Sequence, residues 1–126
     1  MRSAASAAVI LLGLAGAARA QDATHGDPTR GKTLYADCAA CHSLEQGVHA
    51  IGPSLYRILG RKAGGYTDYR YSPALKRSGL TWTAEALDTF IADPQASVPA
   101  NRMPYSGMPD AAARADLIAY LKASAK

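Results

Sequence analysis

The chain has 126 residues, of which 48% are hydrophobic and 19% are charged, and its formal net charge is +4 at pH 7. This length suits a single domain, the composition argues against global disorder, and so mild a charge, with no run of five basic residues, gives no electrostatic sign of a nucleic-acid binder. The aromatic residues are seven Tyr, one Trp and one Phe, so large apolar groups are few, and we expect something other than side chains to fill part of the core.

The first twenty residues predict a cleavable secretory signal peptide. A weakly positive start at Met1-Arg2 precedes an apolar run over 7–18, and Ala18-Arg19-Ala20 gives the small-x-small pattern of a cleavage site. The run is too short for a spanning helix, although an uncleaved membrane anchor is the alternative, and no other run approaches transmembrane length. Cleavage would leave one domain over 21–126, in the periplasm, and because two arginines leave with the signal, 12 basic residues would face 10 acidic ones.

The first half of the mature chain predicts one helix followed by loops. Asp27-Pro28 is typical of an N-cap followed by proline at the first helical position, so we expect a helix of about ten residues that ends near Cys38. Residues 43–53 lack periodicity, which predicts a loop. Residues 54–59 are expected to form one or two helical turns that stop at Gly60, and residues 60–71 a further loop.

The second half predicts three helices. Ser72-Pro73 repeats the cap-and-proline signal and predicts a short helix to about 78. Residues 83–92 place three apolar side chains on one helical face, and the Asp93-Pro94 pair ends that helix. The four prolines over 94–109 predict either an extended, ordered loop or a disordered one, and Asp110 caps a last helix that runs to about 124. The expected buried positions of these two helices are Leu87, Phe90 and Ile91 in the first, and Leu117, Ile118 and Leu121 in the last.

No segment alternates as a strand should, so the predicted class is all-α, with about four or five short helices. Loops as long as these, in so small a domain, need something to pack against.

Residues 38–42, Cys-Ala-Ala-Cys-His, carry the clearest chemical signal. Two thiols three residues apart can form thioethers with the two vinyl groups at one edge of a haem, and His42 is then held beneath the ring as an iron ligand. A redox dithiol lacks the surrounding βαβ pattern, a structural zinc lacks a fourth ligand, and a disulfide would close a very small loop. The motif therefore predicts one haem c attached through Cys38 and Cys41.

A second axial ligand to the iron has four candidates in the mature chain: Met103, Met108, His25 and His49. Met103 is favoured, because the proline-flanked backbone around it can hold a thioether across the ring from His42. Met108 is the local rival, and either methionine could instead fill the core. His49 is expected to be a loop histidine bonded to backbone, and His25 a solvated tail residue.

Residues 26–126 resemble a class I cytochrome c, of the bacterial periplasmic kind that is similar to mitochondrial cytochrome c. The matching segments, in chain order, are Gly31-Lys32 with Tyr35, the Cys-Ala-Ala-Cys-His motif, Ile51-Gly52-Pro53-Ser54-Leu55, Gly60-Arg61-Lys62, Tyr71-Ser72-Pro73-Ala74-Leu75, Gly79-Leu80-Thr81-Trp82, Asp93-Pro94, the stretch from Pro99 to Met103 with Gly107, and Asp116-Leu117-Ile118-Ala119-Tyr120-Leu121. The resemblance implies a cytochrome c fold, in which short helices and long loops wrap one covalently bound haem.

The resemblance also implies roles for single residues. Cys38 and Cys41 match the thioether cysteines, and His42 and Met103 match the two iron ligands. Pro53 resembles the proline whose carbonyl accepts the imidazole N–H and so orients the ring. Three residues resemble those that hold the buried propionate: Tyr71 and Trp82 by hydrogen bonds, and Arg61 as its charge partner. Four residues resemble the contact where the first and last helices cross: Gly31, Tyr35, Leu117 and Tyr120.

Ligation by His and Met fills both axial positions and raises the haem potential, which predicts a soluble one-electron carrier and not an enzyme. The expected partners are redox proteins in transient complexes: a quinol–cytochrome c oxidoreductase, a terminal oxidase or a periplasmic dehydrogenase. Arg102, Lys76 and Arg77 could steer such encounters, or could simply be a solvated face. The protein is expected to be monomeric and to bind no nucleic acid.

Two alternatives remain from the sequence. The chain could be a dedicated cytochrome subunit of a periplasmic dehydrogenase, which predicts a larger exposed apolar patch. If Met103 does not ligate, it could be a five-coordinate haem sensor or enzyme.

Overall fold

The structure is a computed structural model that describes residues 25–124, so the predicted signal peptide at 1–20 lies outside the described residues. Its six helices are joined by loops, and the part of the chain that the structure describes contains no strand, only an isolated bridge between Lys62 and Thr81. The helices are α1 (Pro28–Leu34), α2 (Ala36–Ala39), α3 (Pro73–Arg77), α4 (Ala84–Ala92), α5 (Pro94–Ser97) and α6 (Ala111–Ala123). The all-α prediction is confirmed.

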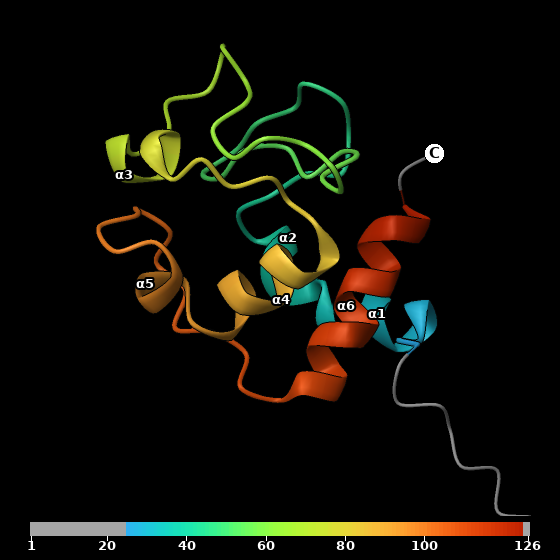
Figure 1. Ribbon diagram of the computed structural model, residues 1–126. Helices are drawn as coiled ribbons and strands as arrows, with labels where there is room; N and C mark the ends of the chain where they lie inside the picture. The colour runs from blue at the N-terminus through green and yellow to red at the C-terminus, as the bar shows by residue number, and fades with distance from the viewer. Residues whose placement is uncertain (1–24, 125–126) are drawn as a thin grey trace, which may run out of the picture.

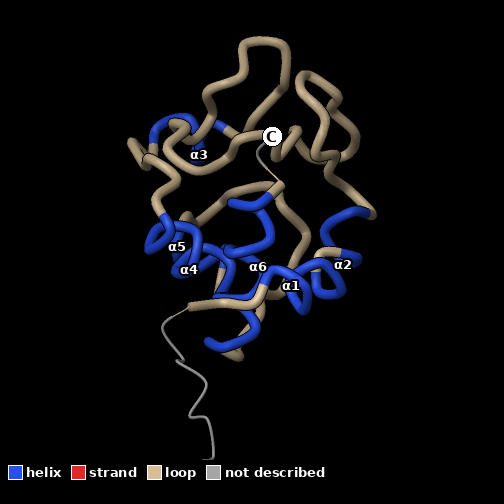
Figure 2. Tube along the Cα trace, turned by 90° about the vertical axis from the view of Figure 1, so that its right-hand side faces the viewer, coloured by secondary structure: helices blue, strands red, loops and turns tan. Residues whose placement is uncertain are grey.

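The helices gather in one half of the molecule and the long loops in the other. In Figure 1, α1, α2, α4 and α6 lie in the lower half, with α1 against α6, and the loops over 43–71 lie above them. Figure 2, turned by 90°, shows the same division, with α3 alone among the upper loops. The two halves therefore face each other across the middle of the protein.

The predicted N-caps are confirmed. The Asp27 side chain accepts a hydrogen bond from the Thr29 N–H, Ser72 accepts one from Leu75, and Asp110 accepts from Ala112 and Ala113. Each side-chain oxygen satisfies a backbone donor that the first helical turn leaves without a partner. Local chemistry thus sets where α1, α3 and α6 begin.

The crossing of α1 and α6 depends on a glycine. A Cβ on Gly31 would lie 2.7 Å from the Cβ of Tyr120 and closer still to the backbone of Asp116, so only glycine allows this approach. Asp116 is buried at the crossing, where its carboxylate accepts the Asp27 N–H at 2.6 Å and the Arg30 Nε–H at 2.7 Å. The Tyr35 and Tyr120 rings pack with centroids 5.4 Å apart. These contacts match the helix crossing that the resemblance implies.

Three predictions about elements were wrong or incomplete. The helix expected from Pro28 is interrupted at Tyr35 and resumes as α2. The one or two helical turns expected over 54–59 are absent: the Leu55 N–H donates to the distant Ser43 carbonyl, and the Arg61 side chain occupies the carbonyls of Ser54 and Tyr56.

The third correction concerns the segment after α4. Asp93-Pro94 ends α4 as expected, but the same pair also begins α5, because the Asp93 carboxylate accepts the Ala96 N–H and Pro94 occupies the first turn. Residues 94–97 are therefore helical and not extended.

The buried core joins α4, α6 and the loops. Leu117 is 1% exposed, and Ile118, expected in the same buried stripe, is half-buried. The buried hydrophobic cluster consists of Tyr35, Ile58, Trp82, Leu87, Phe90, Ile91, Val98, Met108, Leu117 and Leu121.

Candidate functional site

A cavity of about 370 Å³ lies between the helical half and the loop half. Its wall includes all eight residues that sequence reasoning selected, namely Cys38, Cys41, His42, Pro53, Arg61, Tyr71, Trp82 and Met103. Much of the remaining wall is apolar and comes from loops, α3, α4 and α6, and includes Leu55, Ile58, Leu75, Leu87, Phe90, Ile91, Leu117 and Leu121. Residues that lie far apart in the chain thus converge on one space.

Cys38 and Cys41 lie at and just after α2, and both thiols are free and half-buried. Backbone bonds from the N–H groups of Cys41 and His42 to the Cys38 carbonyl hold the motif as a tight turn. Burial, with the nearby Asp37 charge, raises the pKa of the Cys38 thiol to about 11. A redox-active dithiol needs a stabilised thiolate, and the burial of the Cys38 thiol works against one.

The His42 ring is held by backbone on two sides. Its Nδ1 lies 2.7 Å from the Pro53 carbonyl oxygen, the geometry of an N–H donor to that carbonyl. A Cβ on Gly52 would lie 2.6 Å from Nδ1, so the ring packs directly on the Gly52 backbone. Burial lowers the pKa of His42, which favours the neutral ring. A neutral imidazole with Nδ1–H bonded to a carbonyl keeps the lone pair on Nε2 for a metal.

The two methionine candidates occupy different environments. Met103 is half-buried in the cavity wall, whereas Met108 is 9% exposed, belongs to the hydrophobic core and is not part of that wall. The Met108 N–H donates to the Ile91 carbonyl, which fixes Met108 against α4. Only Met103 is thus placed where its sulfur could reach a group inside the cavity.

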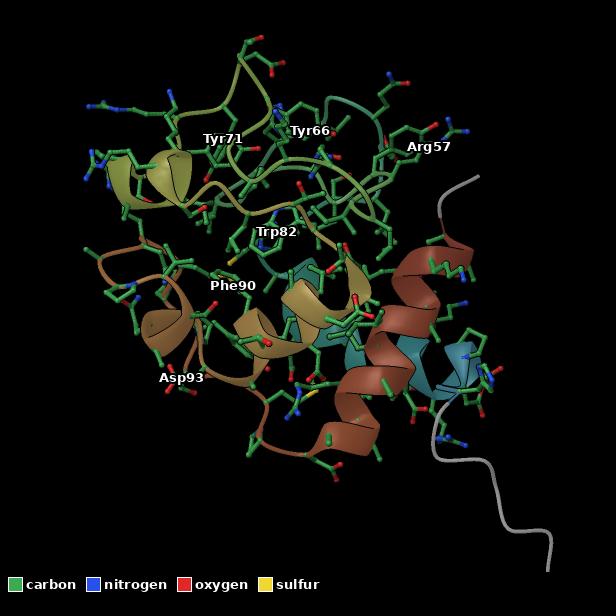
Figure 3. All side chains as sticks on the ribbon, viewed as in Figure 1. Arg57, Tyr66, Tyr71, Trp82, Phe90 and Asp93 are labelled. Carbon is green, nitrogen blue, oxygen red and sulfur yellow. The ribbon has the colours of Figure 1, made fainter. Side chains whose placement is uncertain are left out.

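Arg61 and Trp82 are brought together by backbone pairing of two loops. The Trp82 N–H donates to the Arg61 carbonyl at 2.8 Å, and the Gly60 N–H donates to the Trp82 carbonyl at 2.9 Å. Figure 3 shows Tyr71 in the upper loops, Trp82 below it and Phe90 on α4; the Trp82 and Phe90 rings meet edge to face at 5.0 Å. Tyr71 and Trp82 are both buried.

One hydrogen-bond donor of the Arg61 guanidinium has no partner. Its two terminal nitrogens donate to the Ser54 and Tyr56 carbonyls and to the Tyr66 hydroxyl, and the group lies 4.2 Å from the centre of the Tyr66 ring. Its Nε is buried with no hydrogen-bond partner. A buried cationic donor without an acceptor is costly, and Arg61 lines the cavity, so this atom suits an anionic group inside it.

These features fit a haem. An apolar wall suits the macrocycle, two thiols suit its vinyl groups, an imidazole and a thioether suit the iron, and the unpaired Arg61 Nε suits a propionate. Within residues 25–124, no three His, Cys, Asp or Glu side chains gather as a metal-binding group, so the zinc alternative receives no support.

The other two histidines, His25 and His49, are not part of the cavity wall. His49 is bonded to backbone as expected, since its Nδ1 accepts the Ser54 N–H at 3.0 Å, and its Nε2 also lies 3.1 Å from the Asp68 carboxylate. His25 is exposed.

Sequence reasoning missed two buried polar residues beside the Met103 segment. The Asn101 oxygen accepts the Met103 N–H, an Asx turn that an Asn two residues before the methionine could have suggested. Arg114 on α6 donates to the Met108 and Pro109 carbonyls and to the Asp88 carboxylate. Asp88 lies 26 residues away on α4, and no local signal points to its pairing with Arg114.

Among the described residues, none of the helices has the length and hydrophobicity that crossing a bilayer requires.

Comparisons with known proteins agree with this geometry. The family model described as "Cytochrome c" matches residues 28–125. Cytochrome c2 of Rhodopila globiformis is 45% identical over 98 residues, which cover 77% of this chain and 92% of that protein. Cytochrome c of Euglena viridis is 40% identical over 98 residues, which cover 77% and 96%. The solved structure of cytochrome cH from Methylobacterium extorquens superposes with a TM-score of 0.74 at 42% identity, covering 78% of this chain and 99% of that one.

Proposed function

Because the chain belongs to the cytochrome c family, we propose that it is a one-electron carrier whose single haem is held by Cys38 and Cys41 and ligated by His42 and Met103. Members of this family carry one covalently attached haem c, and they carry electrons. The observation that supports the ligand pair most directly is the cavity itself: His42 and Met103 both line it, and Met108 does not.

When bound, the haem supplies a one-electron couple between ferric and ferrous iron. The protein contributes to this chemistry by fixing the orientation of the proposed ligand His42. Pro53 keeps His42 in the tautomer whose Nε2 can ligate, and Gly52 leaves room for the ring. If His42 and Met103 both ligate the iron, no coordination position would remain for a substrate.

Arg61, Tyr71 and Trp82 are proposed to hold a propionate. The unpaired Nε of Arg61 supports this assignment, and so does the burial of both aromatic side chains in the cavity wall. A carboxylate that accepts a bond from this cation would complete the Arg61 network. The apolar remainder of the wall would keep water from the cofactor, which limits solvent rearrangement when the charge changes.

We propose transient partners: a quinol–cytochrome c oxidoreductase, a terminal oxidase or a periplasmic dehydrogenase. Arg102 is exposed and lines the cavity, and Lys76 and Arg77 are exposed on α3, so positive charge is available for steering. Within residues 25–124, the exposed large hydrophobic residues are Val48 and Ile51. Two exposed residues do not make a large apolar patch, so the permanent-subunit alternative gains no support from this surface.

We also propose export to the periplasm as a monomer with residues 1–20 removed. The apolar run and the Ala-Arg-Ala site support this location. The intact mass of the purified protein tests it: a chain beginning at Gln21 with one haem added is expected, and a retained Met1 would contradict it.

A redox titration with added ligands tests the carrier function. We expect reversible one-electron behaviour, and no binding of carbon monoxide to the reduced protein, because both axial positions would be filled. Rapid carbon monoxide binding, with a high-spin ferric spectrum, would contradict the proposal and favour the five-coordinate alternative.

A further inference from the structure

We propose that Asn101 is the positioning residue of the iron-ligating thioether: its side chain holds the backbone of Met103 against the cavity wall. This inference rests on the proposed function, in which Met103 is a ligand. Asn101 itself touches no reacting atom and would act through Met103.

The Asn101 carboxamide is buried, at 8% exposure, and uses every donor that it has. Its Nδ2 donates to the Pro94 carbonyl at 2.8 Å and to the Val98 carbonyl at 2.9 Å. Its Oδ1 accepts the Met103 N–H at 2.8 Å. One side chain therefore ties the first residue of α5, the residue after α5 and the methionine to one another.

The backbone just before Asn101 adopts a conformation that its own residues do not favour. Ala100 has φ +65°, in the left-handed region that residues with a Cβ disfavour. The chain turns there, immediately before Asn101, and the Gln95 side chain donates to the Asn101 carbonyl at 3.1 Å. A turn held against local preference should relax when the bonds that hold it are removed.

The C-terminal end of this segment, at Met108 and Pro109, is held by a separate set of hydrogen bonds. The Met108 N–H bonds to Ile91, and Arg114 donates to the Met108 and Pro109 carbonyls. No bond made by Asn101 contributes to this second attachment. Losing Asn101 should therefore free the Met103 end of the segment while the core around Met108 stays packed.

A thioether is a neutral ligand, so its affinity for the iron would depend strongly on how well the protein positions its sulfur. A fixed Met103 backbone has less conformational freedom to lose, which lowers the entropic cost of ligation. A free ligand such as imidazole competes for the same axial position, so its dissociation constant reports how well Met103 is held.

The test uses the ferric holoprotein and titrates imidazole into three forms: the wild type, Asn101→Ala and Asn101→Asp. The Asp variant keeps the size of the side chain but loses both donated bonds, and it serves if the Ala variant does not assemble. Asp116→Asn is the matched control, because it weakens the α1–α6 crossing without touching the Met103 segment. The near-infrared sulfur-to-iron charge-transfer band is recorded for every sample.

We expect imidazole to bind at least about tenfold more tightly to each Asn101 variant, since two or three hydrogen bonds are lost. The Asp116→Asn variant should unfold more easily yet keep the wild-type affinity within about twofold. Affinity in both Asn101 variants within twofold of wild type would overturn the inference, and so would an equal gain in the control. If the wild type itself lacks the sulfur band, the ligand assignment fails, and the inference fails with it; an unchanged Asn101 variant with the band present overturns the inference alone.

Discussion

The imidazole Nδ1 of His42 lies 2.7 Å from the carbonyl oxygen of Pro53, eleven residues further along the chain. This contact fixes the tautomer and the rotation of the ring together. It forms because Gly52, just before Pro53, offers no side chain, so the loop can lie flat against the imidazole. The intervening loop is closed by the Gly52 N–H, which donates to the Cys41 carbonyl at 2.8 Å.

Gly52→Ala should displace His42. The added Cβ would lie within 2.8 Å of three ring atoms, and steric insertion of this kind costs about 1–3 kcal/mol. We expect a lower unfolding temperature for the holoprotein and a shifted reduction potential. Gly47→Ala in the same loop is the control, because its Cβ would meet open space, and its cost is the backbone penalty of φ +69°, about 1 kcal/mol. An unchanged potential in Gly52→Ala would contradict the predicted support of the ring.

Stability should depend on pH through Asp116. Hydrogen bonds from Arg30 and from the Asp27 N–H hold the pKa of this carboxyl below its ordinary value. Because the pKa of Asp116 is lower in the folded state, the unfolded state takes up the proton first as the pH falls. The contribution of Asp116 to the free energy of unfolding is therefore complete above about pH 4, the ordinary pKa of an aspartate, and declines as the pH falls from there to the lower folded-state pKa. Urea denaturation of wild type and Asp116→Asn should show a gap in unfolding free energy that narrows below about pH 4. A gap that is constant between pH 6 and pH 3 would show that the ionised carboxylate does not stabilise the fold.

Arg102 should steer the encounter with redox partners. It is exposed on the cavity wall beside Met103, and charges near a docking site act mainly on the association rate. Arg102→Ala should slow electron transfer with a purified quinol–cytochrome c oxidoreductase by about three- to tenfold at low salt. The difference should disappear at about 1 M salt, where the Debye length is about 3 Å. Lys122→Ala, on α6, is the control and should have little effect on the rate. Equal rates at low salt for the wild type and both variants would show that Arg102 does not steer the encounter.

The fold should depend on the attached cofactor. Without the cofactor, the apolar wall around the 370 Å³ cavity would be left open to water instead of buried, and a small domain has only a modest margin of stability to offset that loss. The double variant Cys38→Ala, Cys41→Ala, purified without haem, should therefore show little helix by circular dichroism. A cooperative thermal transition with native helix content would show that side chains alone suffice.

Local signals predicted those parts of the fold that depend on neighbouring residues. Asp27-Pro28, Ser72-Pro73 and Asp110 begin helices as expected, since a cap needs only the next turn. Residues 54–59 were mispredicted because several of their backbone groups bond outside the segment: the Leu55 N–H to Ser43, and the Ser54 and Tyr56 carbonyls to the Arg61 side chain. Tertiary partners of this kind override the local preference.

The candidate site could be predicted because its chemistry sits in short patterns. The Cys-Ala-Ala-Cys-His motif and the resemblance selected eight residues, and all of them line one cavity. The buried supports could not be found in this way: Arg114 meets Asp88 across 26 residues, and Asp116 meets Asp27 across 89. Such pairs exist only once the helices have packed.

The most direct measurement is the optical spectrum of the oxidised protein in the near infrared. We expect a weak sulfur-to-iron charge-transfer band in the wild type and in Met108→Ala, and its loss in Met103→Ala, because Met103 lines the cavity and Met108 lies in the core. A band that survives in Met103→Ala, or a wild type that is high-spin and lacks the band, would contradict ligation by His42 and Met103.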